Sequence, residues 1–218
     1  MNLQFFKYQG AGNDFILLDA RTSRVELSQE QIRLMCDRNF GIGADGLMYL
    51  EKPRHDGDHF YMAYFNADGS ESTMCGNGGR CISKFAQDLG IQASRYSFHA
   101  IDGAHWAEVR EHSVALGMID AEAVVDSHEA FYEDTGSPHH VVLCDAHPAD
   151  FISYARPIRD AYGKEGCNIN TLVQSPHDFS IRTYERGVEN ETLACGTGAV
   201  AAAMVAVHNG VAQVPVRI

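Results

Sequence analysis

Two short stretches of this chain resemble each other, and each is centred on a cysteine. They run from Tyr64 to Gly78 (YFNADGSESTMCGNG) and from Tyr184 to Gly198 (YERGVENETLACGTG). In both, the cysteine follows the tyrosine by eleven positions and a glutamate by four, and it opens a Cys-Gly-x-Gly run. The duplication of a reactive side chain predicts two equivalent groups, Cys75 and Cys195, that face one substrate. Thiols on opposite sides of one carbon would form an acid/base pair.

The position of each cysteine before an expected helix favours this chemistry. A free cysteine has a pKa of about 8.5, and a helix N-terminus is a known means of lowering it. Glycines after the cysteine let backbone N–H groups approach an anion, which the helix N-terminus also attracts. The same arrangement would therefore ease thiolate formation and offer N–H donors to a carboxylate or a developing enediolate. The alternative is a small packed side chain at a helix start, as buried cysteines often are. The matching upstream Tyr and Glu favour chemistry.

The remaining cysteines carry no such motif, and we interpret Cys36, Cys81, Cys144 and Cys167 as core or incidental residues. No pair has CxxC spacing, and five residues between Cys75 and Cys81 make a poor zinc pair. Because the chain is neither short nor evidently secreted, reduced thiols are expected rather than a disulfide framework.

Three further groups of residues could take part in chemistry. His139 follows Gly-Ser-Pro and precedes a strand, so it could help to deprotonate a thiol or could be a surface turn residue. In the pair Glu185-Arg186, Arg could hold a carboxylate bidentately and Glu an ammonium, but an exposed ion pair is the commoner meaning. Four asparagines lie beside glycines, cysteines or strand ends, where turn chemistry explains any one of them: Asn13, Asn66, Asn77 and Asn168.

The elements that must position these residues are short. Strands are expected at 3–8, 14–19, 59–66, 96–99, 105–111, 114–118, 141–144, 171–174, 178–184 and 214–218. Helices are expected at 29–38, capped by Ser28 with Gln31 as a capping box, and at 78–89, 149–156 and 199–207. The last of these is apolar on all sides, which is typical of a helix buried all round.

Many short strands with one enclosed helix in each half predict an α+β fold with two similar domains. The character of the chain restarts near 111–113, so we predict domains at 1–112 and 113–218. The last strand stops in mid-run, which leads us to expect that the natural chain continues.

Composition narrows the class of protein. A chain of 218 residues can form one large domain or two of about 100 residues. A net charge of −12 without a Lys/Arg-rich run argues against a nucleic-acid partner. The sequence has no apolar run of membrane-span length and no signal-peptide pattern, so a cytoplasmic location is expected.

Taken in order, six motifs resemble the diaminopimelate epimerase family over the whole chain. They are Gly10-Ala-Gly-Asn-Asp-Phe15, Phe65-Asn-Ala-Asp-Gly-Ser70, Cys75-Gly-Asn-Gly78, Gly136-Ser-Pro-His139, Tyr184-Glu-Arg-Gly187 and Ala194-Cys-Gly-Thr-Gly198. The resemblance implies two homologous domains, each a mostly antiparallel β-sheet or barrel around a central helix, with the active site in the cleft between them. It also implies cofactor-independent interconversion of LL- and meso-diaminopimelate in lysine and peptidoglycan synthesis, with a homodimer as an expected assembly.

The resemblance assigns roles to individual residues. Cys75 and Cys195 match the catalytic pair, one thiolate and one thiol, with Cys75 facing the proton of the LL substrate and Cys195 that of the meso form. His139 and Glu185 match residues that assist the thiols, and Glu185 also meets the reacting amino group. The remaining matches are the distal-carboxylate and amine set Arg186, Asn66 and Asn168, the N–H cradle Gly76, Asn77, Gly196 and Thr197, and the binding residue Asn13.

The chain departs from the family pattern at Gly46, where many members have Gln, and at Ser137, where many have Asn. The family also continues past residue 218. Two other interpretations stay open. A proline racemase or a phenazine-biosynthesis-type isomerase would share the fold, although proline racemases typically carry His where Asn77 stands and need no Arg186. A redox or metal-binding thiol module, or a degenerate structural homologue, would be non-enzymatic.

Overall fold

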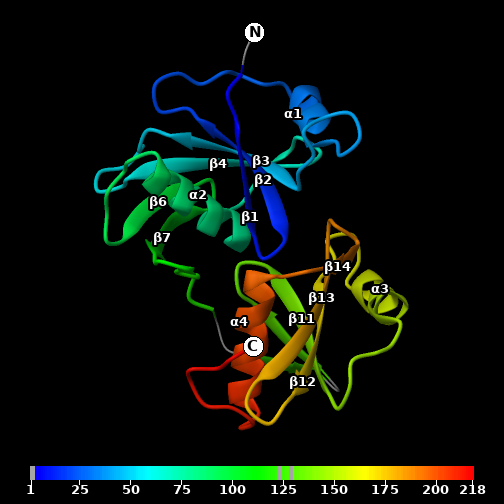
Figure 1. Ribbon diagram of the computed structural model, residues 1–218. Coiled ribbons are helices and arrows are strands. Elements are labelled where there is room, and N and C mark those ends of the chain that lie inside the picture. The colour runs from blue at the N-terminus through cyan, green and yellow to red at the C-terminus, as the bar shows by residue number, and fades with distance from the viewer. Residues whose placement is uncertain (1–2, 122–123, 128–129) are drawn as a thin grey trace. The chain divides into compact units, whose positions relative to one another are not determined.

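The computed structural model describes residues 3–121, 124–127 and 130–218. The chain forms two compact units, Met1–Gly117 and Met118–Ile218 (Figure 1). The expected division at 112–113 would fall just before β8 (Val114–Leu116), which pairs antiparallel with β7 (Gly103–Val109). The first compact unit therefore extends to Gly117.

The first unit contains a mixed sheet in which, among the described residues, eight strands take part. The order is β1-β2-β3-β4-β6-β7-β8, with the short β5 paired to β4. Pairing is antiparallel except between β2 and β3 and between β4 and β6. The other strands of this sheet are β1 (Phe6–Gly10), β2 (Asn13–Asp19), β3 (Gly46–Glu51), β4 (Phe60–Asn66), β5 (Glu71–Ser72) and β6 (Tyr96–Ala100).

Helix α2 (Gly76–Asp88) lies inside the curve of this sheet, as Figure 1 shows. Its Ile82 and Phe85 are buried against Phe15 and Leu17 of β2 and against side chains from β3, β4, β6 and β7. The apolar residues of each strand alternate, so one face meets α2 and the other meets a second helix. At the ends of the strands, the residues on the face that packs on α2 therefore lie near the first turn of that helix.

Helix α1 (Gln29–Cys36) covers the opposite face of the sheet, with Ile32 and Cys36 buried in a second core. Its start matches the expectation from sequence. The Ser28 hydroxyl accepts from the N–H of Gln31 at 3.2 Å, and the Gln31 side chain accepts from the Ser28 N–H at 2.8 Å. This reciprocal pair satisfies two donors that the helix itself leaves without a partner.

Ser28→Ala is expected to lower the free energy of unfolding by about 1 kcal/mol, because it removes the oxygen that accepts from Gln31. Urea denaturation followed by circular dichroism measures the loss. The exposed Ser94 supplies the control, and Ser94→Ala should leave the midpoint where it is. Equal midpoints for both variants would show that the capping box contributes nothing.

The second unit has a sheet of order β14-β13-β12-β11-β10-β9, in which six strands take part among the described residues. Strands β11 and β12 pair in parallel, and the other pairs are antiparallel in the part of the sheet that the structure describes. The strands are β9 (Val125–Ser127), β10 (Ala130–Asp134), β11 (Pro138–Cys144), β12 (Asn168–Gln174), β13 (Phe179–Glu185) and β14 (Asn190–Thr192).

Two helices cover the two faces of this sheet. Helix α4 (Gly196–His208) packs Ala202 and Val205 against Val141 and Leu172, confirming that it is the central helix of this half. Helix α3 (Phe151–Ala161) covers the other face through Phe151 and Ala155. It continues through Pro157, past the end expected from sequence, because its buried side offsets the cost of a proline inside a helix.

The same order of elements occurs in both units. An antiparallel hairpin, β1–β2 or β10–β11, leads through α1 or α3 to a parallel strand, β3 or β12. An antiparallel strand follows, β4 or β13, then a short paired strand, and then a cysteine at the start of the central helix. The duplication seen as two sequence motifs is therefore a duplication of whole α+β units, which confirms the predicted fold class.

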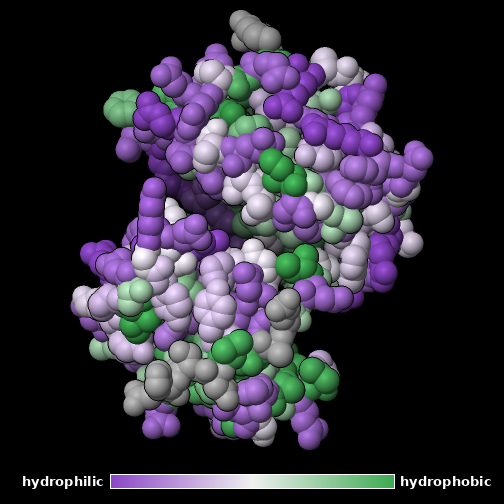
Figure 2. Space-filling model, turned by 180° about the vertical axis from the view of Figure 1, so that it is seen from behind, coloured by the Kyte–Doolittle hydropathy of each residue, from purple (hydrophilic) through white to green (hydrophobic). Residues whose placement is uncertain are grey.

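The expected strand at 214–218 is not a strand in the structure. Its Arg217 carbonyl does accept a hydrogen bond from the N–H of Phe179 at 3.0 Å, so the segment runs beside the start of β13. Over residues 3–121, 124–127 and 130–218, no helix combines the length and the apolar character needed to cross a membrane. Figure 2 shows a mostly hydrophilic face with scattered apolar side chains, which is ordinary for a protein surface.

Candidate functional site

The first cysteine lies at the N-cap of α2. Cys75 has extended backbone angles (φ −91°, ψ 131°) and is half-buried, and its side chain makes no capping hydrogen bond to the helix. Its carbonyl accepts from the N–H of Gly79 at 2.7 Å, which starts the helix. The N–H groups of Gly76 and Asn77 lie in the first turn, at the positive end of the helix dipole.

The Cys75 thiol contacts Asn13 at the start of β2. The Cys75 Sγ lies 3.6 Å from Asn13 Oδ1, and Asn13 Nδ2 donates to Asp45 Oδ2 at 2.6 Å. Arg38 in turn hydrogen-bonds both Asp14 and Asp45 at 2.7 Å. Although partial burial acts to raise it, the Arg38 guanidinium helps to hold the pKa of Asp14 well below its usual range. This charged cluster fixes the Asn13 amide with its oxygen toward the thiol.

The departure at Gly46 has a steric reason. Gly46 is paired with Asn66 across β3 and β4. A Cβ at position 46 would lie 2.6 Å from the ring of Tyr64 and 2.7 Å from the carbonyl oxygen of Phe65. The tyrosine of the repeated motif therefore fills the space that a longer side chain would need. Asn66 itself makes a 3.4 Å hydrogen bond to Ser70 Oγ.

Asn77 is buried in the first turn of α2. Its Oδ1 accepts from Arg80 at 3.0 Å, so that side-chain oxygen is held by its own helix. Asn77 can therefore bind a ligand through its backbone N–H at the helix start.

The second cysteine occupies the equivalent place in the second unit. Cys195 is the N-cap of α4, half-buried, with extended backbone angles (φ −129°, ψ 111°) and no side-chain capping bond. Its Sγ lies 3.4 Å from Thr197 Oγ1, and that hydroxyl lies 2.9 Å from His139 Nε2. His139 therefore reaches the thiol through Thr197, whose backbone carbonyl is held by the Thr135 hydroxyl at 2.9 Å.

A buried polar layer continues from His139 across the sheet. His139 Nδ1 lies 2.8 Å from Asn170 Oδ1, and Asn170 Nδ2 donates to Thr183 Oγ1 at 2.7 Å. Each of the three residues lies two positions along its strand from an apolar residue that packs toward α4, so all three face the same side of the sheet. His139 precedes Val141, Asn170 precedes Leu172, and Thr183 follows Ile181. The polar layer thus lies on top of the apolar core at the N-terminal end of the helix.

The two thiols differ in their neighbours. Asn13 and His139 each lie two positions before an inward-facing apolar residue of the equivalent strand, Phe15 in β2 and Val141 in β11. The unit with Cys75 therefore presents an amide oxygen where the unit with Cys195 presents an imidazole and a hydroxyl.

Burial lowers the pKa of His139 to about 4, and the residue is fully buried. Asp134 acts to raise this pKa and Arg186 to lower it, both more weakly than burial. His139 is consequently a neutral imidazole near pH 7.

This pKa makes stability depend on pH with a defined sign. The unfolded chain takes up a proton at His139 near pH 6.5, before the folded chain does, so the free energy of unfolding falls as pH falls from about 6.5 to about 4. The loss attributable to this residue is about 3 kcal/mol. Urea titrations across that window should show a shallower pH dependence for His139→Gln than for wild type. Parallel curves would contradict the assignment.

Asn168, Glu185 and Arg186 lie together at one edge of this layer. Asn168 Oδ1 accepts the backbone N–H of Arg186 at 2.9 Å, and Asn168 Nδ2 donates to Ser137 Oγ at 2.9 Å. Ser137 therefore bonds Asn168 directly, which gives this departure from the family pattern a defined partner. Glu185 ends β13 and is half-buried, and the Arg186 guanidinium bonds the carbonyl of Glu165 at 3.3 Å.

Gly198 in the first turn of α4 makes room for the layer. A Cβ there would lie 2.8 Å from Asn170 Nδ2 and 3.3 Å from His139 Cε1. The second glycine of the Cys-Gly-x-Gly run is thus required by side-chain packing of the polar layer, beyond any role of its N–H.

Sequence reasoning singled out Cys195, His139 and Asn168 but missed the residues that connect them. Asn170 and Thr183 were not noticed, and Thr197 was expected to contribute its N–H rather than its hydroxyl. A signal was present in 168–174 (NINTLVQ). Its two asparagines are two positions apart, so they lie on one face of the strand, and that face is the one that Leu172 turns toward α4.

The other four cysteines do not enter either site. Burial raises the pKa of Cys36 to about 11 and of Cys81 and Cys167 to about 12, and it also raises the pKa of the half-buried Cys144. These four are free thiols. Among the described residues, no group of three or more His, Cys, Asp or Glu side chains is placed to hold a metal ion.

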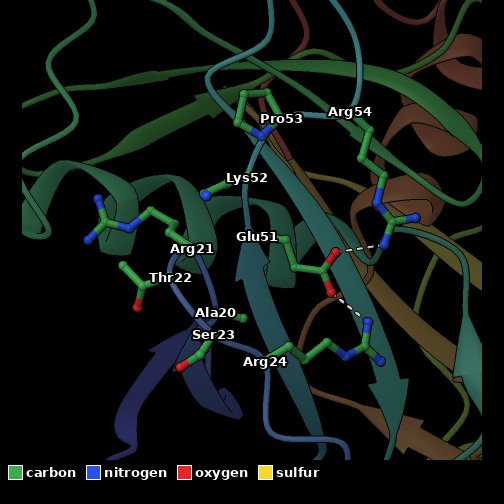
Figure 3. A pocket seen from close by; sticks show the side chains of 9 residues that line it. All are labelled: Ala20, Arg21, Thr22, Ser23, Arg24, Glu51, Lys52, Pro53 and Arg54. Atoms are coloured by element: carbon green, nitrogen blue, oxygen red, sulfur yellow. Dashed lines mark hydrogen bonds and ion pairs between the residues drawn. The ribbon is translucent and has the colours of Figure 1, made fainter.

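A pocket of about 460 Å³ lies elsewhere on the first unit, at the far end of β2 from Asn13. Figure 3 shows its centre, where Glu51 accepts from Arg24 at 2.5 Å and from Arg54 at 2.6 Å. Arg24 also stacks over Tyr49, and Arg54 over Tyr61. These contacts tie the segment after β2 to the end of β3, so we interpret the pocket as a structural junction.

Solved structures with this fold confirm the architecture. The chain matches a phenazine biosynthesis protein of the PhzF family from Bacillus anthracis with a TM-score of 0.66 at 16% identity, covering 94% of this chain and 81% of that one. It matches a probable proline racemase from Agrobacterium radiobacter with a TM-score of 0.67 at 13% identity, covering 98% and 79%. At these identities the likeness concerns the fold alone.

Sequence comparison identifies the family. The profile described as Diaminopimelate epimerase matches residues 5–123 and 131–218. A relative named diaminopimelate epimerase from Flavobacterium psychrophilum is 47% identical over 211 residues, covering 93% of this chain and 80% of the relative. One of the same name from Chlorobaculum tepidum is 45% identical over 215 residues, covering 92% and 82%. Together with the duplicated cysteine-bearing units, these matches establish that the chain belongs to the diaminopimelate epimerase family.

Proposed function

We propose that this chain is an isomerase that converts LL-diaminopimelate to meso-diaminopimelate by a two-cysteine 1,1-proton transfer without a cofactor. One observation carries the proposal: two topologically equivalent units each place a half-buried cysteine at the N-cap of the central helix. Two relatives named diaminopimelate epimerase, 47% and 45% identical, support the substrate. We propose the two units as homologous epimerase domains that act in lysine and peptidoglycan synthesis.

The proton transfer needs one thiolate and one thiol. The Cys75 thiolate removes the α-proton of the LL substrate, so the Cα–H bond breaks and an S–H bond forms. The electron pair passes into the carboxylate as an enediolate. The S–H bond of Cys195 then breaks and a Cα–H bond forms on the opposite face. Exchange with solvent restores the starting protonation of the two sulfurs, and no other reactant is consumed.

The helix N-termini supply the electrostatic part of the proposal. The N–H groups of Gly76 and Asn77, and those of Gly196 and Thr197, lie at the first turns of α2 and α4. They would hydrogen-bond the reacting carboxylate, whose negative charge grows as the enediolate forms. Donors fixed before the reaction are worth more than mobile water because they need no reorganisation.

The residues beside the cysteines select the substrate. We propose that Arg186, Asn66 and Asn168 bind the distal carboxylate and amine. The Arg186 backbone is anchored on Asn168, so these two are already joined before a ligand arrives. A guanidinium suits a carboxylate because it can donate two parallel hydrogen bonds.

Three further residues have proposed roles near the reacting centre. Glu185 ends β13, and its carboxylate would bind the reacting amino group of the substrate in its ammonium form. Glu185 would also assist a thiol. His139 assists Cys195 through Thr197. Asn13 contacts Cys75 and would bind the substrate with its amide.

The alternative within the fold is a proline racemase. Asn77 stands where those enzymes typically carry His, and a substrate with one carboxylate gives Arg186 no partner. Chiral chromatography after incubation with LL-diaminopimelate or with L-proline separates the two. We expect meso-diaminopimelate and no D-proline. Formation of D-proline without meso-diaminopimelate would establish the alternative and overturn our proposal.

Two properties are proposed on the family resemblance rather than on geometry. We place the enzyme in the cytoplasm and propose a homodimer. Light scattering of the purified chain measures the assembly, and a mass equal to one chain of 24.0 kDa would contradict the homodimer. Fractionation of cells tests the location.

A further inference from the structure

The orientation of one amide can be assigned from a backbone group. The N–H of Arg186 can only donate, and it bonds Asn168 Oδ1 at 2.9 Å. Asn168 Nδ2, which can only donate, therefore faces the other way, toward Ser137 Oγ at 2.9 Å and His139 Nε2 at 3.5 Å. A donor at Nε2 requires that this nitrogen carry a lone pair. The backbone thus indicates that His139 has its proton on Nδ1.

The second neighbour of the ring agrees with this orientation. Asn170 Oδ1 lies 2.8 Å from His139 Nδ1, as an acceptor for Nδ1–H must. Because the Asn168 contact assigns the proton to Nδ1, the Asn170 oxygen must face Nδ1, and Asn170 Nδ2 is left to donate to Thr183 Oγ1 at 2.7 Å. Asn170 is fully buried, and Asn170 and Thr183 are paired across β12 and β13. The amide therefore has a polar partner on each side, His139 Nδ1 and Thr183 Oγ1.

We propose that Asn170, held by Thr183, is a positioning residue that fixes His139 as the Nδ1–H tautomer. The consequence for the thiol follows from donor and acceptor rules. With Nε2 as the acceptor, the Thr197 hydroxyl donates to it at 2.9 Å, and its oxygen is left to accept the S–H of Cys195 at 3.4 Å. The direction of every hydrogen bond from Thr183 to Cys195 is then set.

This direction presents Cys195 as a thiol, which is the form that donates a proton. Its link to catalysis rests on the proposed epimerase function, in which Cys195 protonates the carbanion made at Cys75. In the reverse reaction Cys195 must be a thiolate, and the path through Thr197 to His139 removes its S–H proton. The S–H bond of Cys195 breaks as Thr197 Oγ1 takes the proton, and Thr197 passes its own proton to His139 Nε2. The products are a thiolate and an imidazolium, and the tautomer with a proton on Nε2 could not accept it.

The tautomer is measured directly by nitrogen NMR of the full chain labelled with ¹⁵N-histidine. His139→Gln identifies the His139 signals. We expect the Nδ1 signal of wild type to be protonated and the Nε2 signal unprotonated, and Asn170→Asp to retain that pattern because a carboxylate also accepts from Nδ1–H. Asn170→Leu removes the acceptor and should lose the pattern. A wild-type Nε2–H tautomer would overturn the proposal.

Kinetics supply a second readout. Asn170→Leu should lower kcat by about 10- to 100-fold with little change in KM, since it disturbs proton transfer rather than binding. Asn170→Asp should retain most activity and move the acidic limb of the pH–rate profile upward, because a carboxylate stabilises the imidazolium. The charged groups already around His139 are Asp134, Arg186 and its cross-strand neighbour Glu133.

Thr171 provides a matched control on the same strand. It is fully buried, faces the opposite side of the sheet, and bonds a different imidazole, His147 Nδ1, at 2.8 Å. Thr171→Val should cost similar stability while leaving kcat and the His139 spectrum unchanged. If Asn170→Leu behaves like Thr171→Val in both measurements, Asn170 is only structural. If the tautomer is as expected but wild type does not epimerise diaminopimelate, the positioning inference stands and the proposed function fails.

Discussion

Cys75→Ala is expected to lower kcat for diaminopimelate epimerisation by about 10³- to 10⁴-fold, and Cys195→Ala by a similar factor. In the proposed mechanism one thiol transfers the proton on each face of the α-carbon, and each variant removes one of these thiols. The opposite thiol cannot compensate, because a base that removes the proton from one face cannot return it to the other. Binding should change little, since the helix N–H groups are unaffected.

The measurement is the rate of meso-diaminopimelate formation by chiral chromatography, with isothermal titration of substrate binding beside it. Cys144→Ala is the matched control. Cys144 is half-buried like the two motif cysteines, and within the described part of the chain its Sγ bonds only a backbone carbonyl, that of Leu172, at 3.8 Å. It should retain wild-type kcat. Full activity in either Cys75→Ala or Cys195→Ala would remove that residue from the mechanism.

Arg186→Met is expected to lower kcat/KM for LL-diaminopimelate by about 10²- to 10³-fold. Methionine keeps much of the length and loses the charge, so the distal carboxylate would be left without its bidentate partner. Arg156→Met serves as control, because Arg156 is exposed on α3 and, among the described residues, hydrogen-bonds only the Tyr184 hydroxyl, at 3.4 Å.

L-Lysine sharpens this test, since it is diaminopimelate without the distal carboxylate. Wild type should prefer diaminopimelate strongly, and Arg186→Met should narrow that preference because it affects only the substrate with the second carboxylate. If the variant loses the same factor on both substrates, Arg186 supports the fold or the reacting centre instead of reading the distal end.

Much of the fold could be predicted because its signals are local. The Ser28 capping box and the helix after Cys195 each depend on a few neighbouring residues, and both occur, but the helix is not buried on all sides, because Val207 is 39% exposed. Strand β12 begins at Asn168, three residues before the start at 171 that the sequence predicts, because asparagine is unfavourable in strands. At the start of β12, the hydrogen bonds that the asparagines make near the N-terminal end of α4 outweigh the low strand propensity of asparagine.

The site divides in the same way. The cysteines were visible because the chain repeats them, and His139 because of its turn. The layer that joins His139 to Cys195 was not, since Asn170 and Thr183 meet only through strand pairing. The unlike surroundings of the two thiols also depend on register: Asn13 and His139 occupy equivalent strand positions that no local pattern aligns.

Turnover in heavy water tests the two-cysteine account most directly. LL-diaminopimelate is incubated with the chain, the reaction is stopped at low conversion, and deuterium at Cα is measured in both product and recovered substrate. Because one thiol removes the proton and the other supplies a solvent-derived one, the account predicts a deuterium at Cα of the product and a proton retained in recovered LL substrate. A product that keeps the original proton would mean that a single base carries it across, and would contradict the account.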